Sequence, residues 1–390
     1  MKYDFDKIID RKNTGSLKWD VTDRELPMWV ADMDFCTAPA VTDAISARAS
    51  HGVFGYTVLT DDWYEAYRSW WSSRHHFEID KDWLLFCTGT IPAISSIIRK
   101  MTAVAEKIVV MTPVYNIFFN SILNNGRNVL ENRLRLRDGV YEIDFEDLEE
   151  KLSDPQTTLL LLCNPQNPVG KIWDEETLER IGELCAEHHV PVLSDEIHCD
   201  LVKPGREYVP FASVSEKCRM NSITCVSPTK AFNIAGIQTS AVIVPDETIR
   251  YKVNRGLNTD EAAEPNVFAS IAPAAAYMHG GEWLDELNAY LWENRKTAEE
   301  YIDREIEHVT AIRAEATYLL WIDCREITED SEELWRFLRE QTGLYVCDGK
   351  EYHNGDGFLR MNLACPRERL MDGLERLKDG IRAYKTRSGS

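Results

Sequence analysis

Short apolar runs alternate with longer segments of helical period from about residue 82 onward. In chain order these runs read WLLFC, KIVVM, TTLLLLC, PVLS, SITCV and SAVIV. Continuous apolar runs of this length, rich in leucine, isoleucine and valine, are typical of strands buried on both faces of a sheet. The intervening segments, such as DEETLERIGELCAEHH, place apolar residues three and four positions apart, as amphipathic helices do. The pattern therefore predicts a parallel sheet covered by helices on both faces, which is an α/β architecture.

The pattern changes after about residue 280. A long amphipathic helix is expected from Glu282 to about Glu307. It is followed by the strand TYLLWID, the helix SEELWRFLREQTG, a strand near GFLRMNLA and a closing helix over 366–384. Strands are fewer here and helices are segregated from them, which predicts a second, smaller α+β domain. We expect a large domain over 46–280 and a small domain built from 1–45 together with 281–390.

Composition and charge narrow the classes of function. The chain has 390 residues, of which 44% are hydrophobic and 28% charged, and its formal net charge is −21. A surface this acidic repels phosphate backbones and anionic lipids, so neither a nucleic acid nor a membrane is expected as a partner. The start, MKYDFDKIID, lacks the apolar core of a signal peptide, and no apolar run approaches the roughly 18 residues of a membrane helix. We expect a soluble cytoplasmic protein.

Ten cysteines raise the question of disulfides or a zinc site. They are Cys36, Cys87, Cys163, Cys185, Cys199, Cys218, Cys225, Cys324, Cys347 and Cys365. The cysteines are scattered, none forms a Cys-x-x-Cys pair, and several lie inside apolar runs, where a thiol behaves as a small hydrophobic side chain. Reduced core cysteines are therefore expected, and no metal site.

Polar residues follow five consecutive apolar runs. They are Thr88-Gly89-Thr90, Thr112-Pro113-Val114-Tyr115, Asn164-Pro165-Gln166-Asn167-Pro168, Asp195-Glu196 and Ser227-Pro228-Thr229-Lys230. In open α/β sheets, ligands bind beyond the carboxyl ends of the strands. Because these groups meet at one such edge, we expect a ligand site there.

The chemistry of these groups points to one kind of ligand. Thr88-Gly89-Thr90 before a helix can be a simple cap or an anion site, where amide groups and the helix dipole attract a single phosphate. Asp195 can pair with a core arginine or with a protonated ring nitrogen, and Asn167 can form a turn or point at a ligand. Tyr115 can cap the core or stack on a flat ring. Together these groups predict pyridoxal 5′-phosphate, and Lys230, by itself readable as a surface lysine, would form the Schiff base.

The segments that carry these residues resemble a known family. NPQNPVG, SDEIHCDL and SPTKAFNIAG are similar, in this order, to the signature segments of the fold-type I pyridoxal-phosphate enzymes of the class I/II aminotransferase superfamily. YDFDKIIDRKNTGSLKWD, PMWVADMDF and VFGYT resemble its narrower branch of cystathionine β-lyase-like C–S lyases. The resemblance covers essentially the entire chain. It implies a mainly parallel seven-stranded sheet in an α/β/α sandwich, a smaller α+β domain and a homodimer.

The resemblance also implies a role for each site residue. Lys230 would hold the cofactor aldehyde, Asp195 the ring nitrogen and Asn167 the phenolic oxygen, while Tyr115 would stack on the ring. The phosphate would be held by the amides of Thr90 and Ile91, with Ser227 nearby and Tyr56 from the partner subunit. Arg360 in FLRMN would grip the α-carboxylate of an amino-acid substrate, with Ala31 of ADMD lining the same pocket.

The chain departs from the pattern at three places. TGTIP stands where we expect Gly-Val-Val-Pro in this branch, which leaves the phosphate contacts open. His198 stands where many aminotransferases have a tyrosine beside the phenolic oxygen, either supporting the ring or simply satisfied in the core. Gln238 replaces an arginine that binds phosphate in many aminotransferases. None of these changes alters the expected cofactor.

Two reactions are compatible with these residues. Lys230 would remove the Cα proton of the substrate, and the cofactor ring would accept the electron pair. Loss of a thiolate from Cβ then gives pyruvate and ammonia, whereas return of the proton to the cofactor gives a keto acid. The branch resemblance favours β-elimination of L-cystathionine or a related cysteine S-conjugate, with an aminotransferase as the alternative. A third possibility, a regulatory binding protein that keeps the fold, is disfavoured because the lysine is present.

Overall fold

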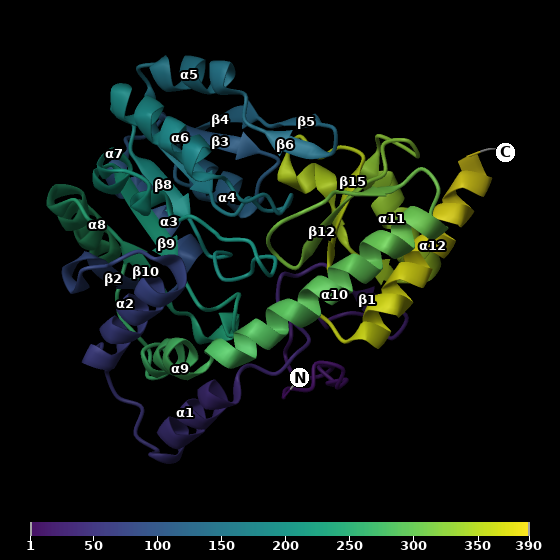
Figure 1. Cartoon of the computed structure of the whole chain (residues 1–390), viewed down its shortest axis with the longest axis horizontal. Helices are drawn as coiled ribbons and strands as arrows, with labels where there is room; N and C mark the ends of the chain where they lie inside the picture. Colours follow the sequence, from purple (N-terminus) through teal and green to yellow (C-terminus); the bar gives the residue numbers. More distant parts are fainter. Residues whose placement is uncertain (1, 389–390) are drawn as a thin grey trace.

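The computed structural model describes residues 2–388 and is built around a seven-stranded sheet (Figure 1). The strand order is β2-β10-β9-β8-β7-β3-β4. These strands are β2 (Leu84–Cys87), β3 (Lys107–Thr112), β4 (Asn128–Arg133), β7 (Thr157–Cys163), β8 (Val192–Asp195), β9 (Ser222–Val226) and β10 (Ser240–Ile243). β10 is antiparallel to both of its neighbours, and the other pairs are parallel. Six of the seven strands match the predicted apolar runs.

Helices cover both faces of this sheet. One face packs against α3 (Thr90–Met101), α4 (Ile117–Leu123) and α8 (Glu247–Thr259), and the other against α5 (Phe145–Ser153), α6 (Glu175–Glu187) and α7 (Glu216–Met220). Side chains of successive strand residues point to opposite faces of the sheet. Ile108 and Val110 belong to the core on the α3 side, and Val109 and Met111 to the core on the α6 side. The runs are continuously apolar for this reason, and the α/β/α sandwich is confirmed.

A third core lies at the end of the sheet occupied by β2 and β10. It is formed by α1 (Pro39–Ser50), α2 (Asp61–His75), α9 (Ile271–His279) and the first half of α10 (Gly281–Glu305). Aromatic side chains dominate this core, and Tyr67, Trp71 and Tyr277 pack on one another with ring centroids 5.0–5.8 Å apart. Such pairs add to the burial of apolar area and make this region rigid.

The smaller α+β domain is built on an antiparallel sheet of order β11-β12-β15-β14. Its strands are β11 (Thr310–Ala311), β12 (Leu319–Asp323), β14 (Cys347–Asp348) and β15 (Phe358–Asn362), and its helices are α11 (Ser331–Thr342) and α12 (Arg367–Ser388). The second half of α10 packs here too, so that this long helix joins the two cores, as Figure 1 shows. The N-terminal strand β1 (Leu26–Pro27) pairs in parallel with β13 (Leu344–Tyr345).

The remaining elements are short. The strands β5 (Arg135–Arg137) and β6 (Val140–Glu142) form a hairpin. The 3₁₀ helices are η1 (Lys81–Trp83), η2 (Phe211–Ser213), η3 (Ala235–Ile237) and η4 (Gly349–Tyr352). Among the helices within residues 2–388, none is both long and apolar enough to span a bilayer.

Candidate active site

A cavity of about 260 Å³ opens at the carboxyl edge of the large sheet. It is lined by groups that follow β2, β3, β7, β8 and β9, the five runs singled out in the sequence. The predicted site residues among its lining are Ala31, Thr90, Ile91, Tyr115, Asn167, Asp195, His198 and Lys230. The fold therefore brings together residues that span most of the chain.

Lys230 follows β9 and reaches into this cavity from one side. Its Nζ donates a hydrogen bond to the carbonyl of Ala31 at 2.8 Å. Burial lowers the pKa of Lys230 to about 8, and the nearby Arg360 guanidinium acts in the same direction. A substantial fraction of this amine is therefore neutral near physiological pH, as a nucleophile or a proton acceptor must be.

Asp195 is the last residue of β8 and is 5% exposed. Its Oδ1 accepts a hydrogen bond from the backbone of Ile197 at 3.2 Å. Burial raises the pKa of Asp195 to about 7, although the Ile197 amide and the Lys230 charge act in the opposite direction. A cation placed against this carboxylate would be attracted strongly and would restore its charge, so the cavity is suited to a protonated ring nitrogen.

The helix α3 begins at the cavity and leaves its first amides without acceptors inside the helix. Thr90 is its first residue, and the Thr90 hydroxyl is buried with no hydrogen-bond partner among residues 2–388. Pro92 is the third residue of this helix and lies in its first turn. Free amides, an unpartnered hydroxyl and the helix dipole are features that suit this end of the cavity to an anion.

Ser227 lies behind the lining rather than on it. Its hydroxyl is within 2.8 Å of the Thr229 hydroxyl and donates to the Thr239 carbonyl at 2.7 Å. Thr229 and Thr239 themselves line the cavity, and so does Gln238. The sequence reasoning did not single out Thr229 and Thr239 as contacts, although Thr229 stands beside Lys230 in the same segment.

Arg360, on β15 of the smaller domain, borders the site. Its guanidinium contacts the Asn167 amide oxygen at 3.4 Å and donates to the Trp29 carbonyl at 2.9 Å. The Nε of Arg360 is buried and unpartnered within the described residues. The arginine also stacks on Tyr352, 4.8 Å from the ring centroid. A buried guanidinium with an unused donor, next to the cavity, is suited to an incoming carboxylate.

His198 and Tyr115 both line the cavity. The Nδ1 of His198 is buried without a partner in the described part of the chain. Burial, together with the charges of Lys230 and Arg360, lowers the pKa of His198 to about 3, so this imidazole is neutral. Tyr115 lies just before α4 rather than inside it, and its ring packs edge-on against Phe118 at 5.8 Å.

Residues 28–35, here called the strap, carry Ala31 to the cavity from the N-terminal segment. The side chain of Asn233 bonds the backbone of Met33 and Phe35, and the side chain of Asn362 donates to the carbonyls of Val30 and Asp32 at 2.6 and 2.7 Å. The strap is thus fixed by one residue after β9 and one residue on β15. The resemblance pointed to Ala31, but no sequence signal indicated how it is held.

Tyr56 lies away from the cavity of its own chain. It belongs to residues 53–58, an extended segment without regular structure. The apolar side chains of Val53, Phe54, Tyr56 and Val58 are all exposed. An exposed apolar run of this kind on a folded chain is typical of a surface that another protein covers.

The family model for aminotransferases of class I and II matches residues 30–377 of this chain. The chain belongs to this family. It is 42% identical over 385 residues to cystathionine β-lyase PatB of Bacillus subtilis (strain 168), covering 97% of this chain and 99% of that protein. Cystalysin from Treponema denticola, solved with a pyridoxal 5′-phosphate cofactor, superposes with a TM-score of 0.95 at 32% identity over 98% of this chain and 100% of cystalysin. The PLP-bound C–S lyase from Staphylococcus hominis, complexed with L-cycloserine, gives 0.91 at 32% identity over 98% of both chains. These relatives confirm the family, its branch and the fold-type I architecture that the sequence segments indicated.

Proposed function

We propose that this protein is a pyridoxal 5′-phosphate-dependent carbon–sulfur lyase. It catalyses α,β-elimination of L-cystathionine or a related cysteine S-conjugate to a thiol, pyruvate and ammonia. The observation that carries the proposal is the position of Lys230, whose amine enters a cavity that also contains Asp195 and the start of α3. Similarity over nearly the whole chain to a cystathionine β-lyase and to C–S lyases supports the choice of reaction within the family.

The residues around the cavity fit this cofactor. Two buried polar atoms there, the Thr90 hydroxyl and Nδ1 of His198, have no partner among residues 2–388 and would gain one from a polar ligand. The phosphate would bind at the amides of Thr90 and Ile91, where α3 begins. Asp195 would hold the ring nitrogen, Asn167 would bind the phenolic oxygen, and Tyr115 would stack on the ring. Together these residues suit a ligand that has an aromatic ring, an anionic phosphate and one cationic ring nitrogen.

The protein side of the reaction follows from these positions. When bound, the cofactor supplies an electron sink for the pair left at the substrate Cα. Arg360 binds the substrate α-carboxylate and orients the Cα–H bond toward Lys230. Because its pKa is about 8, the Lys230 amine accepts the Cα proton near neutral pH. Asp195 would hold the ring nitrogen in its charged form, which would strengthen this sink. The thiolate would then leave Cβ, and hydrolysis of the remaining fragment by water would give pyruvate and ammonia.

Continuous pyruvate formation from L-cystathionine, with no keto acid supplied, tests this function. A lyase regenerates its starting state in every cycle, so pyruvate should accumulate until substrate is exhausted. An aminotransferase, the alternative reaction of the same residues, would form no pyruvate and would release one equivalent per site of the keto acid of L-cystathionine. Lys230→Ala should form no pyruvate, whereas Lys252→Ala, an exposed lysine on α8, should behave as wild type.

The active unit in this proposal is a homodimer, with Tyr56 of one subunit completing the phosphate site of the other. The exposed apolar segment 53–58 supports this arrangement. Each subunit would divide into a large domain over 46–280 and a small domain formed by 1–45 and 281–390. The location of the large sheet between Leu84 and Ile243, and of the small one between Thr310 and Asn362, supports this division.

We propose that the protein acts in the cytoplasm. All ten cysteines are free thiols, nine of them buried, which suits a reducing environment. The net charge of −21 disfavours nucleic acid and anionic membranes as partners. The partners that remain are the small amino-acid substrate and a second copy of this chain.

A further inference from the structure

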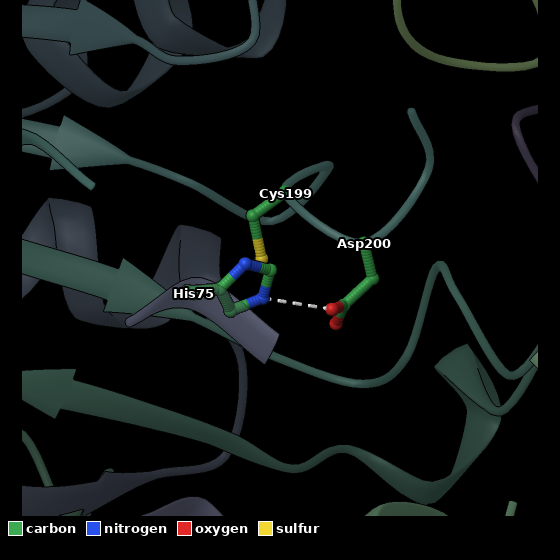
Figure 2. Close-up of side chains that lie close together, drawn as sticks. All are labelled: His75, Cys199 and Asp200. Atoms are coloured by element: carbon green, nitrogen blue, oxygen red, sulfur yellow. Dashed lines mark hydrogen bonds and ion pairs between the residues drawn. The ribbon is translucent and has the colours of Figure 1, made fainter. Parts of the chain in front are cut away.

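A second group of reactive side chains lies on the other side of the loop that follows β8. Asp195, at the end of β8, and His198, in the loop after it, line the candidate active site, whereas the next two residues, Cys199 and Asp200, line a separate cavity of about 360 Å³. His75, the last residue of α2, meets them there. Figure 2 shows the thiol of Cys199 and the carboxylate of Asp200 directed at the His75 ring.

The three side chains are close enough to share one ligand. One potential metal-binding atom from each residue lies within 4.8 Å of the other two. Nε2 of His75 is 2.9 Å from Oδ1 of Asp200. Movements of about 1 Å would bring all three atoms to the separations of 3–4 Å that a tetrahedral ion with bonds of 2.0–2.3 Å requires.

Asp200 has an unused acceptor in this group. The carboxylate is 6% exposed, and its Oδ1 already accepts from the Trp70 indole at 2.8 Å. Its Oδ2 is buried and has no hydrogen-bond partner among residues 2–388. Buried carboxylate oxygens are normally satisfied, so an atom of this kind indicates a missing partner. The side-chain amide of Asn288 donates a hydrogen bond to the backbone carbonyl of Asp200 at 2.9 Å. This bond fixes the backbone that carries the carboxylate.

We infer that His75, Cys199 and Asp200 form a binding site for one zinc ion. A thiolate, an imidazole and a carboxylate are ligands that zinc accepts together, and soft sulfur with nitrogen disfavours magnesium and calcium. The two anionic ligands balance the charge of Zn²⁺. The adjoining cavity leaves a fourth position for water or a small ligand.

The charged side chains around this cavity are compatible with a cation. Arg74 is paired with Asp285, with nitrogen–oxygen distances of 2.5 and 3.1 Å, and Arg206 is 3.1 Å from Glu315. The two arginines of the lining therefore have acidic partners of their own, and Lys203, which also lines the cavity, lies over the Trp292 ring with its Nζ 5.9 Å from the centroid. The Trp70 indole, which donates to Oδ1 of Asp200, would orient that ligand from outside the coordination sphere.

The ion would connect two elements that the chain brings together from far apart. His75 and Asp200 are separated by 125 positions. A bond between the end of α2 and the loop after β8 would restrain the loop that carries His198 and directly follows Asp195. The site would thus support the active-site wall without touching substrate.

Zinc retention by the cofactor-loaded protein tests the inference. The protein is stripped with a chelator, dialysed against Zn²⁺ alone and analysed for metal content and by zinc X-ray absorption. We expect one ion per chain with one sulfur at about 2.3 Å and nitrogen or oxygen at about 2.0–2.1 Å. Wild-type protein that retains no zinc, or zinc without a sulfur neighbour, overturns the inference.

Variants then assign the ligands. Cys199→Ser should weaken zinc binding at least about tenfold and remove the sulfur contribution, and His75→Gln should weaken it similarly. Cys185→Ser removes an equally buried thiol on α6 and should leave the zinc affinity and the sulfur contribution unchanged. Far-ultraviolet circular dichroism and the cofactor absorbance confirm folding of each variant. If Cys199→Ser retains the wild-type zinc signal, the sulfur belongs to another cysteine and the inference is wrong.

Discussion

Two consecutive carboxyl groups, Asp195 and Glu196, are buried at the end of β8. Burial raises the pKa of Asp195 to about 7 and that of Glu196 to about 8. The Glu196 oxygens accept from Ser194, Tyr208 and the Phe211 amide, so this acid is held inside the protein core. Because the folded-state pKa values lie above the unfolded ones, the contribution of both groups to stability is fully present below about pH 4 and is lost progressively as the pH rises from about 4 through their folded-state pKa values of about 7 and 8.

Asp195→Asn should therefore stabilise the cofactor-free protein at alkaline pH. The amide keeps the shape of the carboxyl group but never has to be buried with a charge. We expect its advantage over wild type in the free energy of unfolding to grow by about 2 kcal/mol between pH 5 and pH 8. Urea unfolding at the two pH values measures this difference.

The same variant should bind pyridoxal 5′-phosphate more weakly, because the ring nitrogen loses its counter-ion. Equilibrium titration of the cofactor-free protein gives this affinity. A variant that is less stable than wild type at pH 8 would show that Asp195 is already paired in the cofactor-free protein, contrary to our interpretation.

At the scale of elements, β15 joins Arg360, the arginine proposed to bind the substrate carboxylate, to the strap. Arg360 and Asn362 are two residues apart and point to the same side of the strand. Arg360 donates to the carbonyl of Trp29, and Asn362 donates to those of Val30 and Asp32. One strand of the smaller domain thus fixes both the arginine and the backbone that carries Ala31.

Asn362→Ala should loosen the strap and reduce substrate binding. Two strap carbonyls lose their donor, which we expect to lower the free energy of unfolding by about 1–3 kcal/mol. Displacement of Ala31 should raise KM for the amino-acid substrate about tenfold. Steady-state kinetics and urea unfolding measure the two effects.

Asn294→Ala provides the matched control. Asn294 is also buried and donates to two carbonyls of the smaller domain, those of Leu363 and Cys365, at 3.0 and 2.9 Å. This variant should lose comparable stability while its KM stays near the wild-type value. Equal KM changes in the two variants would mean that the strap has no special part in substrate binding.

At the scale of the whole molecule, the cavity of one chain lacks a contact that the resemblance assigns to Tyr56. The exposed segment 53–58 offers that residue to a second copy. In a dimer with shared sites, a Lys230→Ala chain and a Tyr56→Ala chain are defective in different halves of each site. Their heterodimer would contain one site with both native residues.

Mixing these two variants should therefore restore activity. If subunits exchange at random, half of the dimers are mixed and each mixed dimer has one intact site, which gives about a quarter of wild-type activity. Pyruvate formation after refolding of the mixture measures the recovery. The control is a mixture of Lys230→Ala with a second Lys230 variant, Lys230→Gln, which should remain inactive. If the Lys230→Ala and Tyr56→Ala mixture recovers no activity, Tyr56 lies outside the neighbouring site.

The sequence predicted the apolar strands well and an amphipathic one poorly. β3, β7 and β9 are buried on both faces, so their composition alone identified them. β4 (NVLENR) lies at the edge of the sheet, where only one of its six residues is fully buried, and its mixed composition gave no strand signal. The residues lining the cavity followed from the rule that parallel strands end at one edge.

By itself, the sequence determined the order of strands and helices, the groups at the strand ends and the chemistry of Lys230 with Asp195, because these depend on residue type and on neighbours along the chain. Only the tertiary structure decided which distant segments meet. Packing between elements far apart in sequence produces three such contacts. Lys230 bonds Ala31, Asn362 bonds the strap, and His75 lies close to Cys199. Local periodicity carries no information about such contacts, since they depend on how layers and loops stack in three dimensions.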